Sequence, residues 1–201
     1  LGQCFQPLLI FYFYSMTRLL CVTIILFISF CHFSQPNYSV SVNSNPSKGN
    51  LFFQTGGSSI KPVSILDSSG IEIFWADWGL KGWDFKVNNN NKLTYFDRSS
   101  KAWYIMDSLK NILDSVYCLN GYVADNHDFI ALKNGNYILF AYDEQTYAMD
   151  TVVPGGDPNA IVEGLIIQEL DSNHNLLFEW SSWDHFNITD NVTLNLTNAS
   201  I

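Results

Sequence analysis

The stretch HDFIALKNGNYILF, from His127 to Phe140, decides the fold class. It contains two short apolar runs separated by the polar residues Asn134-Gly135-Asn136. Short apolar runs on either side of an Asn-Gly turn are typical of a β-hairpin. An earlier stretch has the same form, with Trp83-Asp84-Phe85-Lys86-Val87, an Asn-rich turn and Leu93-Thr94-Tyr95-Phe96. The pattern recurs 44 residues apart, from Asp84 to Asp128.

A second pattern alternates with the first. Asp67, Asp107 and Asp171 each follow an apolar residue and precede a serine, and another apolar residue comes a few positions later. The first two copies lie 40 residues apart, and the third is delayed by an inserted segment, Asp143–Ala160. Repeats of about 40–50 residues with four short strands each are typical of β-propeller blades. We therefore expect the three aspartates at equivalent hairpin turns, whereas a β-sandwich with chance similarity in its turns is the alternative.

The predicted fold is all-β, with residues 63–201 supplying about two to three blades of a propeller. An extended lead-in segment, residues 35–62, precedes them and is rich in Ser, Asn, Pro and Gly. Two or three blades are too few to close a ring, and an open ring leaves a sheet edge exposed. We therefore expect the chain to be part of a longer protein.

Residues 1–34 are predicted to be a signal peptide or a membrane anchor. Met16 is a plausible start, which would place residues 1–15 upstream of it, and Arg18 precedes an apolar run from Leu19 to Phe33. One positive charge before a short apolar run is typical of a secretory signal. We expect an apolar N-terminal helix, possible membrane attachment through it, and an exported protein that is periplasmic, extracellular or bound to the cell surface.

Charge and cysteine content narrow the possible partners. The formal net charge is −9, which argues against a nucleic-acid partner, because such a surface needs clustered Lys and Arg. After the leader the only arginine is Arg98 and the only cysteine is Cys118. No disulfide framework, metal site or cofactor is predicted.

His127 and His185 are the candidate catalytic residues. Each is adjacent to an aspartate, and each has a phenylalanine within two positions. An aspartate can orient an imidazole, which can then carry a proton or a covalent group. Strand alternation predicts that His127 and Phe129 share one face. The competing interpretations are a structural His127 bonded to Asp128 or to a main-chain carbonyl, and a His185 that only fills a turn; a third histidine, His174, is expected in a plain solvated turn.

An ordered set of segments resembles the arylsulfotransferase family over residues 63–201. The set comprises His127-Asp128-Phe129 with Asn134-Gly135-Asn136, then Val153-Pro154-Gly155-Gly156-Asp157-Pro158, then Gly164-Leu165-Ile166-Ile167-Gln168, then Trp183-Asp184-His185-Phe186. The resemblance implies an exported six-bladed propeller. It also implies transfer of a sulfuryl group from a phenolic sulfate to a phenol acceptor through a sulfated histidine, without a nucleotide donor.

The resemblance also places individual residues. It implies that His127 starts an inner strand facing the propeller channel and that His185 holds the next such position. The nucleophilic histidine and the sulfate-binding arginine are expected beyond Ile201, because Arg98 lies in a turn-like stretch, and the fragment itself is expected to be inactive. A non-catalytic surface propeller that binds a ligand or a protein is the alternative function. Near the end of the chain, Asn187, Asn191, Asn195 and Asn198 each begin an Asn-X-Ser/Thr glycosylation sequon.

Overall fold

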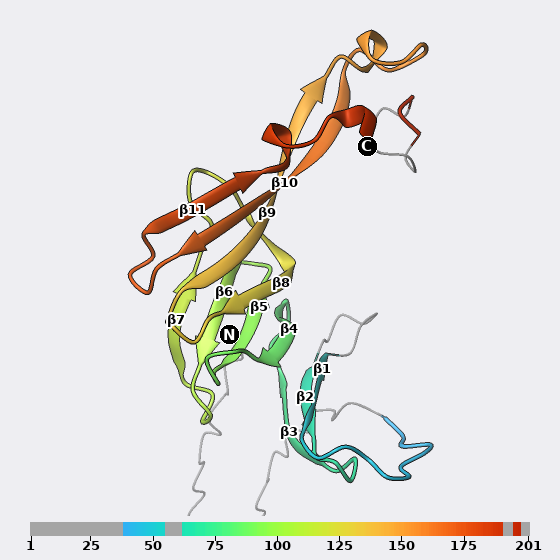
Figure 1. Cartoon of the computed structure of the whole chain (residues 1–201). Coiled ribbons are helices and arrows are strands. Elements are labelled where there is room, and N and C mark those ends of the chain that lie inside the picture. The colour runs from blue at the N-terminus through green and yellow to red at the C-terminus, as the bar shows by residue number, and fades with distance from the viewer. Residues whose placement is uncertain (1–37, 55–61, 191–194, 198–201) are drawn as a thin grey trace, which may run out of the picture. The chain divides into compact units, whose positions relative to one another are not determined.

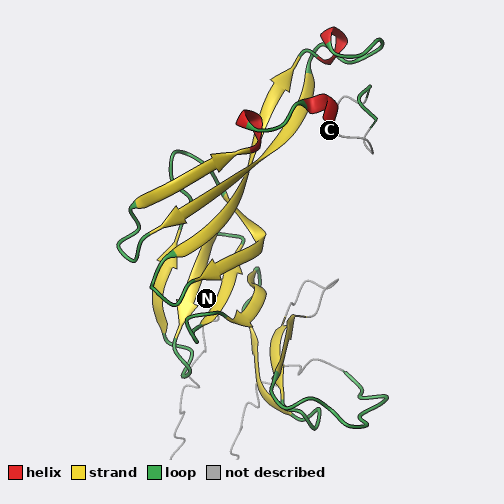
Figure 2. Cartoon of the chain, in the orientation of Figure 1, coloured by secondary structure: helices red, strands yellow, loops and turns green. Residues whose placement is uncertain are grey.

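The computed structural model describes residues 38–54, 62–190 and 195–197. These residues form three antiparallel sheets and three short 3-10 turns (Figures 1 and 2). The prediction of an all-β protein is confirmed. None of the helical turns in the described part of the chain is long and apolar enough to cross a membrane. The predicted leader, residues 1–34, lies outside the described residues.

The first sheet has the strand order β1-β2-β3, with β1 at Leu51–Gln54, β2 at Pro62–Leu66 and β3 at Glu72–Asp77. Every residue of β2 is buried, and the strand lies between β1 and β3. The strand β1 belongs to the predicted lead-in segment 35–62. That segment therefore contributes a strand to the first sheet.

The second and third sheets each contain four strands in chain order. The second sheet comprises β4 (Lys81–Val87), β5 (Leu93–Asp97), β6 (Ala102–Met106) and β7 (Ile112–Val116). The third comprises β8 (Ala124–Ala131), β9 (Tyr137–Tyr147), β10 (Ala160–Leu170) and β11 (Leu176–Ser181). The 3-10 turns are η1 (Met149–Thr151), η2 (Ser182–Asp184) and η3 (Ile188–Asp190).

The three aspartate turns are equivalent, as predicted. The hairpins β2–β3, β6–β7 and β10–β11 each join the last two strands of their sheet. In each hairpin the aspartate carboxylate accepts a hydrogen bond from the main-chain N–H four residues later, at 3.0 Å for Asp67, 2.9 Å for Asp107 and 2.8 Å for Asp171. Each hairpin also has a register shift one residue before its aspartate. An Asp-Ser turn of one geometry is thus repeated three times.

The 44-residue repeat of the first two strands is confirmed as well. Val87 pairs with Leu93 across the β4–β5 turn, and Ala131 pairs with Tyr137 across the β8–β9 turn. Both turns close with a hydrogen bond of 2.8 Å between the residue that follows the first strand and the carbonyl oxygen four residues on. The strands β4 and β8 are therefore equivalent positions in consecutive sheets.

Aromatic and aliphatic side chains fill the space between the sheets. Trp103 of β6 and Phe129 of β8 are both fully buried, and their rings stack at 5.1 Å between centroids. Another cluster joins the first sheet to the second through Val63, Ile65 and Phe85. Burial of a large apolar side chain stabilises a fold by roughly 1.5–3 kcal/mol. Each pair of consecutive sheets thus shares an apolar core.

The hairpin β9–β10 is longer than its neighbours and extends past them (Figure 1). Its pairing continues from Tyr137 opposite Leu170 to Tyr147 opposite Ala160. A separate apolar cluster packs at the far end, around Met149, Ala160 and Val162. The inserted segment predicted from the sequence is therefore a structured extension of the third sheet.

Candidate functional site

His127 lies in a bulge of β8, the first strand of the third sheet. Ala124 pairs with Ala141 and Phe129 pairs with Leu139, so four residues of β8 face a single residue of β9. Such a bulge redirects side chains. The side chain of His127 is 75% exposed, whereas Phe129 is 0% exposed. The prediction that these two residues share one face is wrong, because the bulge interrupts the alternation.

Asp125 holds the imidazole of His127. Nδ1 of His127 lies 2.6 Å from Oδ1 of Asp125, and the same oxygen accepts a hydrogen bond from the main-chain N–H of His127 at 2.9 Å. The indole of the buried Trp103 donates to the main-chain carbonyl of Asp125 at 3.0 Å. The alternative in which Asp128 binds the ring of His127 is wrong, because the carboxylate of Asp128 binds Lys86.

Lys86 lies between two carboxylates and joins β4 to β8. Its Nζ is 2.5 Å from Oδ2 of Asp84 and 2.5 Å from Oδ1 of Asp128. Burial alone would lower the pKa of Lys86, but the two hydrogen-bonded carboxylates outweigh it and raise that pKa. Burial raises the pKa of Asp84, with the lysine acting against the shift. Burial alone would also raise the pKa of Asp128. The hydrogen bond from Lys86 outweighs burial there and lowers the pKa of Asp128.

Arg98 approaches the same bulge from the β5–β6 turn. Its guanidinium carbon lies 3.7 Å from the ring centroid of Trp83, and its Nη2 donates to Oδ1 of Asn126 at 3.4 Å. Asn126 is the residue immediately before His127. Sequence reasoning set Arg98 aside because it lies in a turn. No local pattern predicts this position of Arg98, because its partners Trp83 and Asn126 are distant in the sequence.

His185 does not start a strand. It follows η2, and its ring stacks on Trp180 of β11 at 5.1 Å between centroids with an interplanar angle of 2°. Phe186 meets the same indole edge-on. The expectation that His185 occupies an inner-strand position equivalent to His127 is therefore wrong. No hydrogen bond or ring contact joins His127 to His185 in the described residues.

His174 has a structural role that the sequence did not reveal. Its Nε2 lies 3.0 Å from Oδ2 of Asp114 on β7, and the hydroxyl of Tyr137 donates to the same oxygen at 3.3 Å. The turn that contains His174 is thus attached to the neighbouring sheet. The expectation of a plain solvated turn is corrected accordingly.

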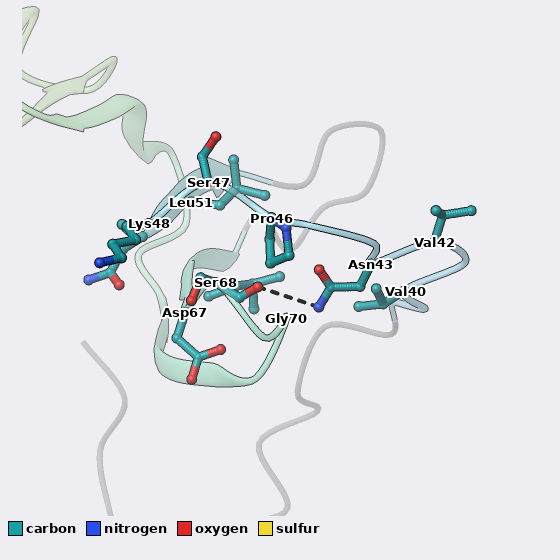
Figure 3. A pocket seen from close by; sticks show the side chains of 13 residues that line it. Val40, Val42, Asn43, Pro46, Ser47, Lys48, Leu51, Asp67, Ser68 and Gly70 are labelled. Carbon is teal, nitrogen blue, oxygen red and sulfur yellow. Dashed lines mark hydrogen bonds between the residues drawn. The ribbon is translucent and has the colours of Figure 1, made fainter.

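A pocket of about 350 Å³ lies elsewhere, between the lead-in segment and the β2–β3 turn (Figure 3). Val40, Pro46 and Leu51 contribute apolar surface to it, and Asn43 donates to the carbonyl of Ser68 at 3.4 Å. Neither candidate histidine lines this pocket. It is therefore distinct from the β8 bulge.

The bulge has the elements of acid–base chemistry. A neutral imidazole that donates from Nδ1 to a carboxylate keeps Nε2 as an acceptor for an incoming proton. The guanidinium of Arg98 brings a permanent positive charge to the neighbouring residue. Among the described residues, no group of three or more His, Cys, Asp or Glu side chains is arranged to hold a metal ion.

Comparison with known proteins does not assign the chain to a family. No protein-family model matches the chain, and no curated protein shows significant similarity to it. The resemblance to arylsulfotransferases thus receives no support from either comparison.

Proposed function

We propose that the three sheets are successive blades of a β-propeller. The 44-residue equivalence of β4 and β8 and the three matching aspartate turns support this arrangement. So does the direct bonding between first strands, in which Lys86 of β4 binds Asp128 of β8. In a propeller the first strands of consecutive blades lie side by side around a central channel. The bulge with His127 would then be in that channel.

The proposed activity is sulfuryl transfer between phenols, the reaction of the family that the sequence resembles. In this reaction the bond between sulfur and the donor's phenolic oxygen breaks, and the departing oxygen needs a proton. Sulfur bonds first to a histidine and then, as that bond breaks, to the oxygen of the acceptor phenol, which must lose its own proton. We assign this acid–base role to His127, since Asp125 orients its ring. This aspartate–histidine pair is the observation that carries the proposal.

The proposal gives roles to two further groups. Arg98 would stabilise the negative charge of the transferring group, because a guanidinium donates several hydrogen bonds to oxyanions. His185 stays a candidate with a weaker claim, since its ring is stacked on Trp180. Phenolic sulfate and phenol are small, so the proposal requires no protein or nucleic-acid partner.

The proposal includes export. A single positive charge, Arg18, before a short apolar run to Phe33 is typical of a signal peptide and supports this part of the proposal. N-terminal sequencing of exported protein should begin between about residues 32 and 35 if the leader is cleaved there. An intact leader on membrane-bound protein would show an anchor instead.

The activity is tested with protein made from its complete reading frame. An aryl sulfate that releases a coloured phenolate is mixed with a second phenol, in the absence of any nucleotide sulfate donor. The proposal predicts that phenolate release depends on the acceptor and that the acceptor becomes sulfated. Binding of phenols without any transfer would favour the non-catalytic propeller.

A further inference from the structure

Two glycosylation sequons follow β11 in the chain and pack against the long hairpin β9–β10. They are Asn187-Ile188-Thr189 and Asn195-Leu196-Thr197. The middle residues, Ile188 and Leu196, are half-buried and pack against the apolar cluster around Met149, Ala160 and Val162. Each sequon is thus fixed to the hairpin by its central side chain.

The acceptor side chains are on the outside. Asn187 and Thr189 are exposed, and so are Asn195 and Thr197. This alternation follows from the half-buried middle residue, because the residues on either side of it turn away from the cluster. The Asn-X-Thr sequence makes each asparagine a candidate acceptor, and the exposure of its first and third residues leaves room for a glycan on the folded protein.

The second sequon also has a defined local geometry. The main-chain N–H and the hydroxyl of Thr197 both donate to Oδ1 of Asn195, at 3.2 Å and 2.8 Å. The carboxamide oxygen is therefore occupied by the threonine, and the side chain is held in a turn. In the first sequon, Oδ2 of Asp190 accepts a hydrogen bond from the main-chain N–H of Asn187 at 2.9 Å. Both asparagines lie in closed turns outside the strands.

We propose that Asn187 and Asn195 are acceptors of N-linked glycans. In this modification Nδ2 of the asparagine forms a bond to the first sugar carbon of a lipid-pyrophosphate-linked oligosaccharide. The bond from that carbon to the pyrophosphate oxygen breaks, the lipid pyrophosphate leaves, and Nδ2 gives up one proton to the transferase. The inference depends on export of the chain, but not on sulfuryl transfer.

The position of the sequons is compatible with the proposed site. The cluster beneath them is built on Met149, Ala160 and Val162, at the far end of the hairpin, whereas β8 pairs with β9 only between Tyr137 and Ala141. Glycans at the far end would leave the β8 bulge open. They would also keep the distal hairpin in water and exclude it from protein contacts.

Valine and serine variants test each site. Thr189→Val and Thr197→Val keep the shape of threonine and remove the hydroxyl that the sequon needs, whereas Thr197→Ser keeps it. The complete protein is secreted from a eukaryotic cell behind the signal peptide of a known secreted protein, so that entry into the export pathway is fixed. We expect each valine variant to lose one glycosidase-sensitive step in mobility and Thr197→Ser to retain it.

Protein from its own cells provides the decisive measurement. It is treated with an amidase that releases N-glycans in heavy-oxygen water, and the peptides are read by mass spectrometry. Conversion of Asn187 and Asn195 to heavy-oxygen aspartate is expected. Recovery of either residue as unmodified asparagine, or a mobility step that persists in its valine variant, overturns the proposal for that residue.

Discussion

The side-chain amide of Asn88 donates to the main-chain carbonyl of Phe129 at 2.8 Å and thereby connects the end of β4 to β8. Its carbonyl oxygen accepts from the N–H of Ala131 at 2.9 Å, so one side chain replaces a short piece of ladder between two sheets. Asn88 is only 7% exposed. Removing it leaves two buried main-chain groups without these partners.

We therefore expect Asn88→Ala to lower the free energy of unfolding by about 2–3 kcal/mol. Urea titration followed by tryptophan fluorescence measures the change. The matched control is Asn89→Ala, an exposed residue of the same turn, which should change the free energy by less than about 0.5 kcal/mol. Equal effects of the two substitutions would show that the connection between the sheets does not depend on Asn88.

Substitution by glycine should change the free energy of unfolding in opposite directions at two exposed turn lysines. Lys101 has a φ of 57°, a left-handed conformation that is unfavourable for any residue with a Cβ. Lys133 lies in the β8–β9 turn without a positive φ. Lys101→Gly should raise the free energy of unfolding by about 0.5 kcal/mol, and Lys133→Gly should lower it by about the same amount. Thermal or urea unfolding of both variants gives the comparison, and changes of the same sign would contradict it.

Asp97 should contribute to acid sensitivity. It is 2% exposed, accepts hydrogen bonds from the N–H and hydroxyl of Ser99 at 2.9 Å and 2.5 Å, and lies 3.5 Å from Nζ of Lys81. Burial alone would raise its pKa, but these partners outweigh burial and lower the pKa. A carboxyl group with a lowered folded pKa stabilises the fold above its unfolded pKa of about 3.9. That stabilisation is lost as the pH falls through the folded value.

The variant Asp97→Asn removes this titration. Between about pH 5 and pH 2 the wild-type protein should lose roughly 1 kcal/mol more unfolding free energy than the variant. Urea titrations at several pH values measure both slopes. Parallel slopes would mean that Asp97 has the same pKa in the folded and unfolded chain.

Local turn chemistry made the hairpins predictable. The aspartate at position 67, 107 or 171 forms its hydrogen bonds within five residues, so the sequence pattern contains the whole turn. The bulge at His127 was not predictable in this way. It depends on Trp103, which binds the carbonyl of Asp125 from another sheet. Strand alternation predicts the face of a side chain only where the strand is regularly paired. At His127, tertiary contacts interrupt that regular pairing.

The candidate histidines also show that local contacts could be predicted from the sequence and long-range contacts could not. A carboxylate partner for His127 was foreseen from its neighbours, but the partner is two residues before it and not one after it. The ring of His185 stacks on the indole of Trp180, five residues earlier, and His185 does not start a strand as the repeat had predicted. The contact between Arg98 and Asn126 joins residues 28 positions apart. No local pattern carries that information.

The central claim is that His127 is a catalytic acid–base in sulfuryl transfer. The direct test is the rate of transfer from an aryl sulfate to a phenol by the wild-type protein, His127→Ala and His174→Ala, all made from the complete reading frame. His174 is the matched control, since it also pairs with an aspartate, at 3.0 Å, but in the turn between β10 and β11. We predict a loss of roughly 10²-fold or more in His127→Ala and an unchanged rate in His174→Ala. An unchanged rate in His127→Ala, or a wild-type protein without transfer, would contradict this assignment.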